Sequence, residues 1–152
     1  MQNKQFDMAE LYTVILEVIE SGGEFRLFPR GTSMLPLLRE GRDSVLLMKP
    51  SALKKHDICL YRRSDGSFVL HRLMKLTKQG EPLFCGDNQA ALERGVPREA
   101  IIARVCAFYR GERRVSLASI SYRLYVFFYV VLRMRYLRLL PRRIKARLYR
   151  KK

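Results

Sequence analysis

The sequence predicts a mainly β protein: a compact antiparallel β-barrel or sandwich with one helical segment at each end. Between residues 24 and 117 the apolar residues gather in short runs separated by turns that contain Gly or Pro, which is typical of antiparallel strands. Near both ends of the chain the spacing is that of helices. We therefore divide the chain into an N-terminal helix that packs on the body (1–23), a β domain (24–117) and a basic, apolar-striped helical tail (118–152).

The N-terminal helix is predicted over residues 7–21. Its apolar residues recur at i, i+3, i+4, i+7 and i+8, and they are Leu11, Val14, Ile15, Val18 and Ile19. Asp7 is a suitable N-cap and Gly22-Gly23 a suitable stop. Three glutamates lie within this stretch, so we expect a surface helix that packs on the body, and neither a secretory signal nor a membrane span.

The expected strands follow one another closely, as antiparallel neighbours do. Ser64-Asp65-Gly66 has the composition of a hairpin turn between the third and the fourth strand. The expected strands cover residues 25–28, 44–48, 57–62, 68–76, 83–85 and 101–109, and a further strand starts at Val115.

Length and composition fit one folded domain. The chain has 152 residues, of which 48% are hydrophobic and 29% are charged, and this excludes a disordered tail or a fibre. A domain of this size can bury its own core. It leaves no room for a multidomain enzyme with a separate nucleotide-binding half.

The positive charge is concentrated at the C-terminal end. The formal net charge is +16, and residues 123–152 hold 11 of the 30 Lys and Arg but none of the 14 Asp and Glu. Such a segment favours a polyanion as its partner: a phospholipid surface, a nucleic acid or an acidic protein.

The cysteines predict neither a zinc site nor a disulfide framework. Cys59, Cys85 and Cys106 are odd in number and far apart, and no CxxC pair is present. We expect three buried free thiols, which fit a reducing compartment. No metal or cofactor is expected.

A candidate nucleophile follows the first strand. Ser33 lies in the tight turn Arg30–Pro36, directly after Gly31 and Thr32. A serine held in a turn, with backbone amides directed toward it, is what acyl transfer requires. The alternative is a turn serine with no catalytic role.

A candidate base and two candidate acids follow in the chain. His71 comes 38 positions after Ser33 in a predicted strand, on the same face as its i±2 neighbours. Asp87 stands in a Gly turn and Glu93 shortly after it. Together they supply the nucleophile, base and orienting acid of a serine hydrolase. The alternatives are a half-buried strand histidine and an aspartate that only caps its own turn.

Four motifs in register resemble a known family, the type I signal peptidases. They are Gly31-Thr32-Ser33-Met34-Leu35-Pro36, Asp57-Ile58-Cys59-Leu60-Tyr61, His71-Arg72 and Gly86-Asp87-Asn88. Within the family the chain looks like the ER-type or Gram-positive sporulation-type branch, in which the base is His. The resemblance implies a β-rich peptidase fold and a cofactor-free serine endopeptidase that cleaves a precursor or leader-bearing peptide near a membrane. It implies Ser33 as the nucleophile and His71 as the general base.

The resemblance leaves two candidates for the acid. Asp87 matches the aspartate of the Gly-Asp-Asn motif and is favoured, while Glu93 matches a second acidic position that is usually Asp. Where the family commonly has a Ser two positions before the nucleophile, this chain has Gly31. The expected oxyanion-hole donor is therefore the Ser33 backbone N–H, with Thr32 as a further candidate. The family's N-terminal membrane anchor has no match before the first motif.

The C-terminal segment predicts membrane association. Residues 115–132 contain a single charge, Arg123, but an Arg near the bilayer centre costs about 2.5–3.5 kcal/mol. We therefore favour an amphipathic helix that lies on an anionic membrane. The expected location is the membrane surface, with a peripheral or C-terminal attachment, and otherwise the cytoplasm.

Two functions from different classes remain open. The favoured one is a serine endopeptidase whose partners are a peptide or precursor-protein substrate and an anionic membrane surface. The alternative is a non-catalytic binding module of the same fold, whose cationic tail binds lipid or nucleic acid. Nucleic acid is the less favoured partner, because the tail has so much continuous aliphatic surface.

Overall fold

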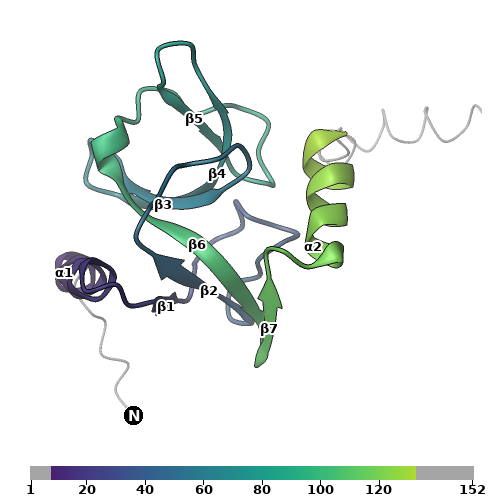
Figure 1. Cartoon of the computed structure of the whole chain (residues 1–152), viewed down its shortest axis with the longest axis horizontal. Coiled ribbons are helices and arrows are strands. Elements are labelled where there is room, and N and C mark those ends of the chain that lie inside the picture. Colours follow the sequence, from purple (N-terminus) through teal and green to yellow (C-terminus); the bar gives the residue numbers. More distant parts are fainter. Residues whose placement is uncertain (1–7, 133–152) are drawn as a thin grey trace, which may run out of the picture.

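The structure, a computed structural model, describes residues 8–132 (Figure 1). These residues form one seven-stranded sheet with a helical segment on each side. The prediction of a mainly β, antiparallel architecture is confirmed. The elements are α1 (Met8–Glu20), β1 (Phe25–Leu27), β2 (Asp43–Met48), β3 (Ile58–Arg62), β4 (Phe68–Leu76), β5 (Pro82–Cys85), the 3-10 turn η1 (Arg98–Ala100), β6 (Ile101–Arg110), β7 (Arg113–Ser116), α2 (Ile120–Tyr125) and the π-helical η2 (Val126–Val131).

The strands are ordered β1-β2-β6-β3-β4-β5, and β7 pairs with β6. Every strand pair is antiparallel. The β3–β4 hairpin closes through the predicted turn: the Arg63 N–H donates to the Ser67 carbonyl at 2.9 Å, and Gly66 adopts a φ of +85°. A residue with a side chain rarely adopts that left-handed conformation, which explains a glycine at this position.

The sheet is bent but not closed into a barrel. In the described part of the chain, β1 and β5 end the hydrogen-bonded order and do not pair with each other. The register shifts in three strand pairs, between Leu46 and Leu47 in β2, in β3 after Leu60, and in β4 after Leu73. Such irregularities bend and twist a sheet. Figure 1 accordingly shows β4 and β5 at one end of the molecule and β1, β2 and β7 at the other.

The hydrophobic core has two parts, one on each face of β3. Ile58 and Leu60 belong to the larger cluster, whereas Cys59 and Tyr61 belong to the smaller one. Successive side chains of a strand point to opposite faces, so β3 is buried from both sides. The side chains on the face of Tyr61 prove important for the candidate site.

The helix α1 contributes to the larger cluster through only part of its apolar stripe. Ile15 and Ile19, four residues apart, are 3% and 0% exposed, whereas Val14 is 45% exposed. Leu11 and Val18 are half-buried. The contact with the sheet is therefore narrower than the stripe in the sequence.

Two of the three cysteines are buried and Cys106 is half-buried, and all three are free thiols. Burial raises the pKa of the Cys59 thiol to about 12, so this residue behaves as a small apolar core residue. The expectation of three buried thiols is thus wrong for Cys106.

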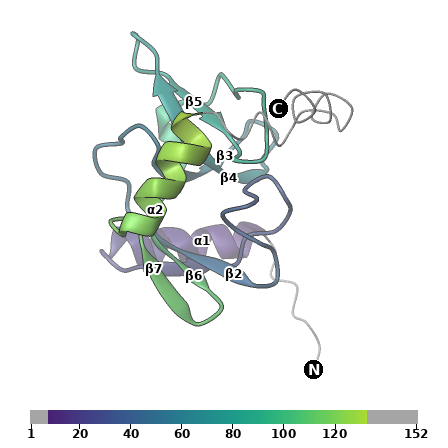
Figure 2. The same cartoon turned by 90° about the vertical axis from the view of Figure 1, so that its right-hand side faces the viewer.

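The C-terminal helix α2 is capped by Ser119, whose hydroxyl accepts a hydrogen bond from the Tyr122 N–H at 3.3 Å. Figure 2 shows α2 and η2 running along one side of the molecule from β7 toward β5. Residues 133–152, which make up most of the predicted basic, apolar-striped tail, lie outside the described residues. Within residues 8–132, no helix has the length and hydropathy that crossing a membrane requires.

Candidate active site

Ser33 lies in the loop between β1 and β2, and a second loop holds its backbone in place. The Asn88 N–H donates to the Ser33 carbonyl at 2.8 Å, and the Asn88 side-chain amide donates to the Thr32 carbonyl at 3.1 Å. A Cβ on Gly86 would lie 2.6 Å from the Ser33 carbonyl oxygen. The close approach of the two loops therefore requires glycine at position 86.

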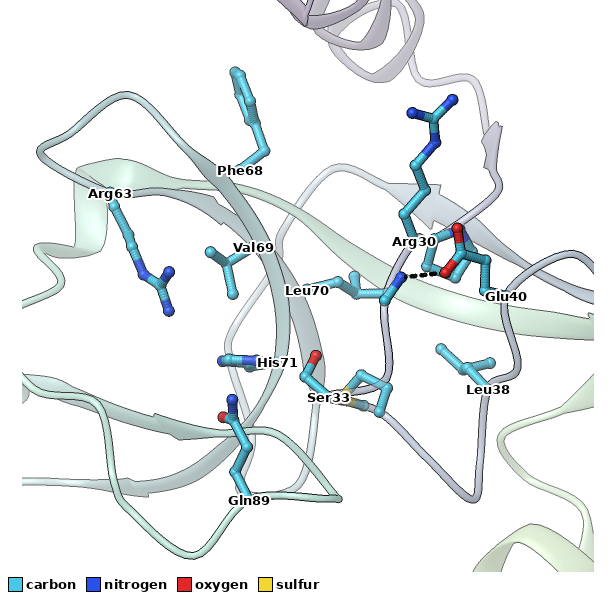
Figure 3. Close-up of a pocket in the computed structure, with 13 residues that line it drawn as sticks. Arg30, Ser33, Leu38, Glu40, Arg63, Phe68, Val69, Leu70, His71 and Gln89 are labelled. Atoms are coloured by element: carbon cyan, nitrogen blue, oxygen red, sulfur yellow. Dashed lines mark hydrogen bonds between the residues drawn. The ribbon is translucent and has the colours of Figure 1, made fainter.

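Ser33 and His71 line the same cleft, which has a volume of about 240 Å³ (Figure 3). The figure shows the His71 ring between Arg63 and Gln89, with Ser33 next to the same strand. Apolar side chains line another part of the cleft, among them Met34, Leu38 and Leu70.

The structure brings the expected nucleophile and base to one cleft without a direct bond between them. Among the described residues, no hydrogen bond joins Ser33 Oγ to the His71 ring. The Ser33 N–H likewise makes no hydrogen bond within residues 8–132, so it can donate to an oxyanion. Thr32, the further candidate donor, has an exposed side chain.

The His71 side chain is buried and has polar partners at Nδ1. Its ring is 3% exposed, and Nδ1 lies 3.1 Å from the Tyr61 hydroxyl oxygen and 3.6 Å from Glu93 Oε2. Burial lowers the pKa of the imidazole below its usual value. The ring is therefore neutral near pH 7, the state in which it can accept a proton.

Glu93 is fixed in place by three hydrogen bonds. Arg63 Nε and Nη2 donate to the two carboxylate oxygens at 2.5 and 2.7 Å, and the Tyr61 hydroxyl donates to Oε2 at 2.7 Å. The hydrogen bond from Arg63 is the main cause that lowers the pKa of this carboxyl, so Glu93 is ionised. On the backbone, Glu93 forms a bridge with Phe84 of β5, which places it beside His71.

Asp87, the acid favoured from the sequence, has other partners. Both of its carboxylate oxygens accept from Arg72, at 2.7 and 2.6 Å, and Oδ2 also accepts from the Tyr125 hydroxyl at 2.9 Å. Both members of the Arg72–Asp87 pair are fully buried. The structure therefore places Glu93, and not the favoured Asp87, beside the His71 ring, whereas Asp87 contacts Arg72.

Strand geometry explains why Glu93, and not Asp87, lies beside His71. His71 and Arg72 are neighbours on β4, so their side chains point to opposite faces of the sheet. Tyr61 shares a face with His71, because Cys59 is opposite His71 in the register and Tyr61 lies two residues further along β3. Asp87 lies on the face of Arg72 and Glu93 on the face of His71.

Three residues of this network were not predicted from the sequence. Tyr61 and Arg72 were only members of motifs, and Arg63 was not singled out at all. The alternation along β3 and β4 could have placed Tyr61 beside His71. No local pattern could have paired Arg63 with Glu93, because the two residues are 30 positions apart and Glu93 lies in a loop.

The arrangement holds a neutral imidazole and a serine at one cleft, with an ionised carboxylate 3.6 Å from the imidazole, which suits acyl transfer. Among residues 8–132, no group of three or more His, Cys, Asp or Glu side chains could hold a metal ion. Comparison of the chain with protein-family models, with curated proteins and with solved structures finds no match.

Proposed function

We propose that this chain is a serine endopeptidase, similar in fold and mechanism to type I signal peptidases, that cleaves a precursor or leader-bearing peptide. Ser33 is the nucleophile and His71 the general base. The observation that carries the proposal is the shared cleft of Ser33 and His71, together with the Glu93 carboxylate that lies 3.6 Å from Nδ1 of the imidazole. The four motifs named above support the same assignment.

In the proposed reaction, Ser33 Oγ attacks the scissile carbonyl carbon while His71 takes the hydroxyl proton. The imidazolium that forms is stabilised by the negative charge of Glu93. His71 then gives the proton to the leaving amine, the C–N bond breaks, and an acyl ester of Ser33 remains. A water molecule then attacks this ester and gives its proton to His71. The bond between the acyl carbon and Ser33 Oγ breaks, Oγ takes the proton from His71, and the second product leaves.

Glu93 takes the place of the acid in this proposal. It lies within 3.6 Å of His71 Nδ1 and carries a full negative charge held by Arg63. Asp87 instead contributes to the geometry of the site, because it pairs with Arg72 next to His71 and precedes the Asn88 that holds the Ser33 backbone.

The oxyanion would be stabilised by the Ser33 backbone N–H. Gly31 leaves the position two residues before the nucleophile without a side-chain donor, and it adopts a φ of +85°. The Gly31 N–H donates to Glu40 at 2.8 Å, which fixes the start of the loop. A backbone donor held in a fixed loop requires little reorganisation during the reaction.

The size of the cleft limits what can bind beside Ser33. A volume of about 240 Å³ lies below the range of sites that hold drug-sized ligands, about 300–1,000 Å³. It suits small substrate side chains next to the cleaved bond.

The test uses a fluorophosphonate, which modifies an activated serine and needs no knowledge of the substrate. We expect one adduct per chain, located on Ser33 by peptide mass spectrometry, and none in Ser33→Ala or His71→Ala. Ser67→Ala removes an exposed serine outside the cleft and is the matched control. A Ser33→Ala chain that is labelled as well as the native chain contradicts the proposal.

A second proposed function is docking on an anionic membrane surface, and exposed apolar side chains on the C-terminal helix favour it. Six of them lie on α2, η2 and the residue that follows, each 46% to 75% exposed: Ile120, Leu124, Phe127, Phe128, Val131 and Leu132. Monomeric soluble proteins rarely expose so many apolar side chains together. This apolar face, as we call these six residues, leads directly into the basic segment of the sequence.

The combination of positive charge and exposed apolar side chains favours a membrane as the occupant of the apolar face. The basic residues within and after the helix complement anionic headgroups, and the apolar face complements the acyl boundary below them. A nucleic acid would match the charge but would leave the apolar face in water. The alternative, a non-catalytic binding module for nucleic acid, is therefore one of the outcomes of the vesicle-binding test described below.

A further inference from the structure

We propose that Tyr61 is a positioning residue, which connects His71 to Glu93 and fixes the imidazole in the tautomer that a general base needs. This inference rests on the proposed peptidase function, but its central observable, the proton position on His71, can be measured without turnover.

The phenol of Tyr61 stands between the base and the acid. Its oxygen lies 3.1 Å from His71 Nδ1 and 2.7 Å from Glu93 Oε2. The direct separation of Nδ1 and Oε2 is 3.6 Å, which is too long for a hydrogen bond. Glu93 therefore acts on His71 mainly through the hydroxyl group of Tyr61.

The position of that hydroxyl is well defined. Tyr61 is fully buried, and its ring stacks on Phe84 with 4.5 Å between the centroids and 21° between the planes. Phe84 is also the residue that bridges to the backbone of Glu93. One packing unit thus holds both the phenol and the carboxylate.

Counting protons gives the direction of each hydrogen bond. Glu93 is ionised, so it can only accept, and Tyr61 has one hydroxyl proton, which it donates to Glu93. The Tyr61 oxygen must then accept from His71, so the ring proton sits on Nδ1. The other nitrogen, Nε2, keeps its lone pair and is the atom that can take the proton of Ser33.

The phenol keeps its own proton throughout. Burial, followed by the hydrogen bond to Glu93, raises the pKa of Tyr61 far above its usual value. When His71 becomes an imidazolium, Nδ1–H still donates to Tyr61 and the hydroxyl still donates to Glu93. The negative charge reaches the imidazolium through two polarised hydrogen bonds, with no transfer of the Tyr61 proton.

The test compares the full-length native chain with Tyr61→Phe by ¹⁵N NMR of the histidine rings. The chain has only two histidines, so His56→Gln assigns the signals of His71. In the native chain near pH 7 we expect a protonated Nδ1 and an unprotonated Nε2. In Tyr61→Phe, Nδ1 loses its acceptor, and we expect a mixture in which Nε2 is protonated in a large share of the molecules.

The rate of fluorophosphonate labelling is the second measurement. We expect Tyr61→Phe to be labelled at least about tenfold more slowly, because fewer molecules hold the base in the reactive tautomer. Tyr109→Phe is the matched control, since Tyr109 lies on β6 and is not among the residues that line the cleft. It should leave both measurements unchanged.

The outcomes separate this inference from the proposed function. A native His71 with its proton on Nε2, or a Tyr61→Phe chain with an unchanged tautomer, overturns the role of Tyr61. A native chain with the expected tautomer, lost in Tyr61→Phe, supports that role. If the native chain shows the expected tautomer but is not labelled by the fluorophosphonate, the peptidase proposal fails while the positioning of His71 by Tyr61 stands.

Discussion

Arg72 and Asp87 form a buried ion pair that connects three parts of the molecule. Nη2 of Arg72 lies 2.6 Å from Oδ2 of Asp87, and both side chains are fully buried. Two tyrosines of α2 join the pair: the Tyr122 hydroxyl accepts from Arg72 at 2.9 Å, and the Tyr125 hydroxyl donates to Asp87 at 2.9 Å. The strand of His71, the loop that holds Ser33 and the C-terminal helix therefore meet at one charged contact.

The first prediction concerns the stability of this contact. Asp87→Asn leaves the Arg72 guanidinium buried without its counter-charge, and breaking a buried pair in this way costs about 3 kcal/mol. We expect that loss in the free energy of unfolding measured with urea. Glu99→Gln, which removes an exposed carboxylate, is the control and should change the stability by less than about 0.5 kcal/mol.

The second prediction concerns the acid of the site. Glu93→Gln removes the negative charge that stabilises the imidazolium, and comparable substitutions in serine peptidases lower the rate by up to about 10⁴-fold. We expect a decrease of at least about 10²-fold in peptide cleavage or fluorophosphonate labelling. Asp87→Asn should retain more activity, once it is measured at a temperature where that variant is folded. An active Glu93→Gln chain together with an inactive, stable Asp87→Asn chain would restore the assignment favoured from the sequence.

The third prediction is the pH dependence of activity. His71 must be neutral to accept the serine proton, and burial lowers its pKa below the usual value of about 6.5. Activity should therefore be constant at neutral pH and should fall only as the pH drops through the lowered pKa. A kcat/KM profile measured from pH 4 to pH 8 checks this. An acidic limb centred above pH 7 would contradict it.

The lowered pKa of His71 should also make the protein less stable as the pH falls. Below a pH of about 6.5 the unfolded chain takes up a proton on this histidine while the folded chain does not, so the free energy of unfolding should decrease as the pH falls toward the folded-state pKa. The His71→Gln variant should lack this part of the pH dependence, which urea denaturation at several pH values can measure.

The sequence predicts the strands well because their signals are local. Runs such as Phe68–Leu76 and the Ser64–Gly66 turn contain their own structural information, and the observed strands agree with the expected ranges to within two residues at each end. The sequence could not show that the sheet stays open, because closure into a barrel depends on bulges and register shifts that leave no clear mark in the sequence.

The candidate site was predictable only in part. Ser33 and His71 reach one cleft as the motifs imply, but the choice between Asp87 and Glu93 depends on which face of β4 each acid meets. His71 and Arg72 are neighbours on one strand and point to opposite faces, so His71 contacts Glu93 and Arg72 contacts Asp87. The linear spacing of the acids does not contain that information.

The contacts of α2 also change how the tail can be studied. Removing the chain from Ser121 onward would take away Tyr122 and Tyr125, and with them two hydrogen bonds to the buried Arg72–Asp87 pair. A truncated protein would therefore lose stability as well as the tail. Point substitutions on the exposed side of the helix are the cleaner experiment.

The last prediction concerns the apolar face. We expect the full-length chain to co-sediment with vesicles that contain anionic phospholipid and only weakly with neutral ones, because basic residues are worth about 1 kcal/mol each near an anionic surface. The combined variant Leu124→Gln, Phe127→Gln and Phe128→Gln should bind the anionic vesicles at least about tenfold more weakly, since three exposed apolar side chains no longer enter the acyl boundary. Added salt should weaken the binding of both chains to anionic vesicles. Only the native chain should keep the apolar part of this binding at high salt.

Val14→Gln is the matched control for that variant, because Val14 is exposed to a similar extent, 45%, but lies on α1. It should bind vesicles as the native chain does. If the combined variant also binds normally, the apolar face is not the part of the chain that meets the membrane. If the native chain ignores anionic vesicles and binds single-stranded RNA tightly instead, the cationic segment serves a nucleic acid, and a binding module becomes the better description of this end of the protein.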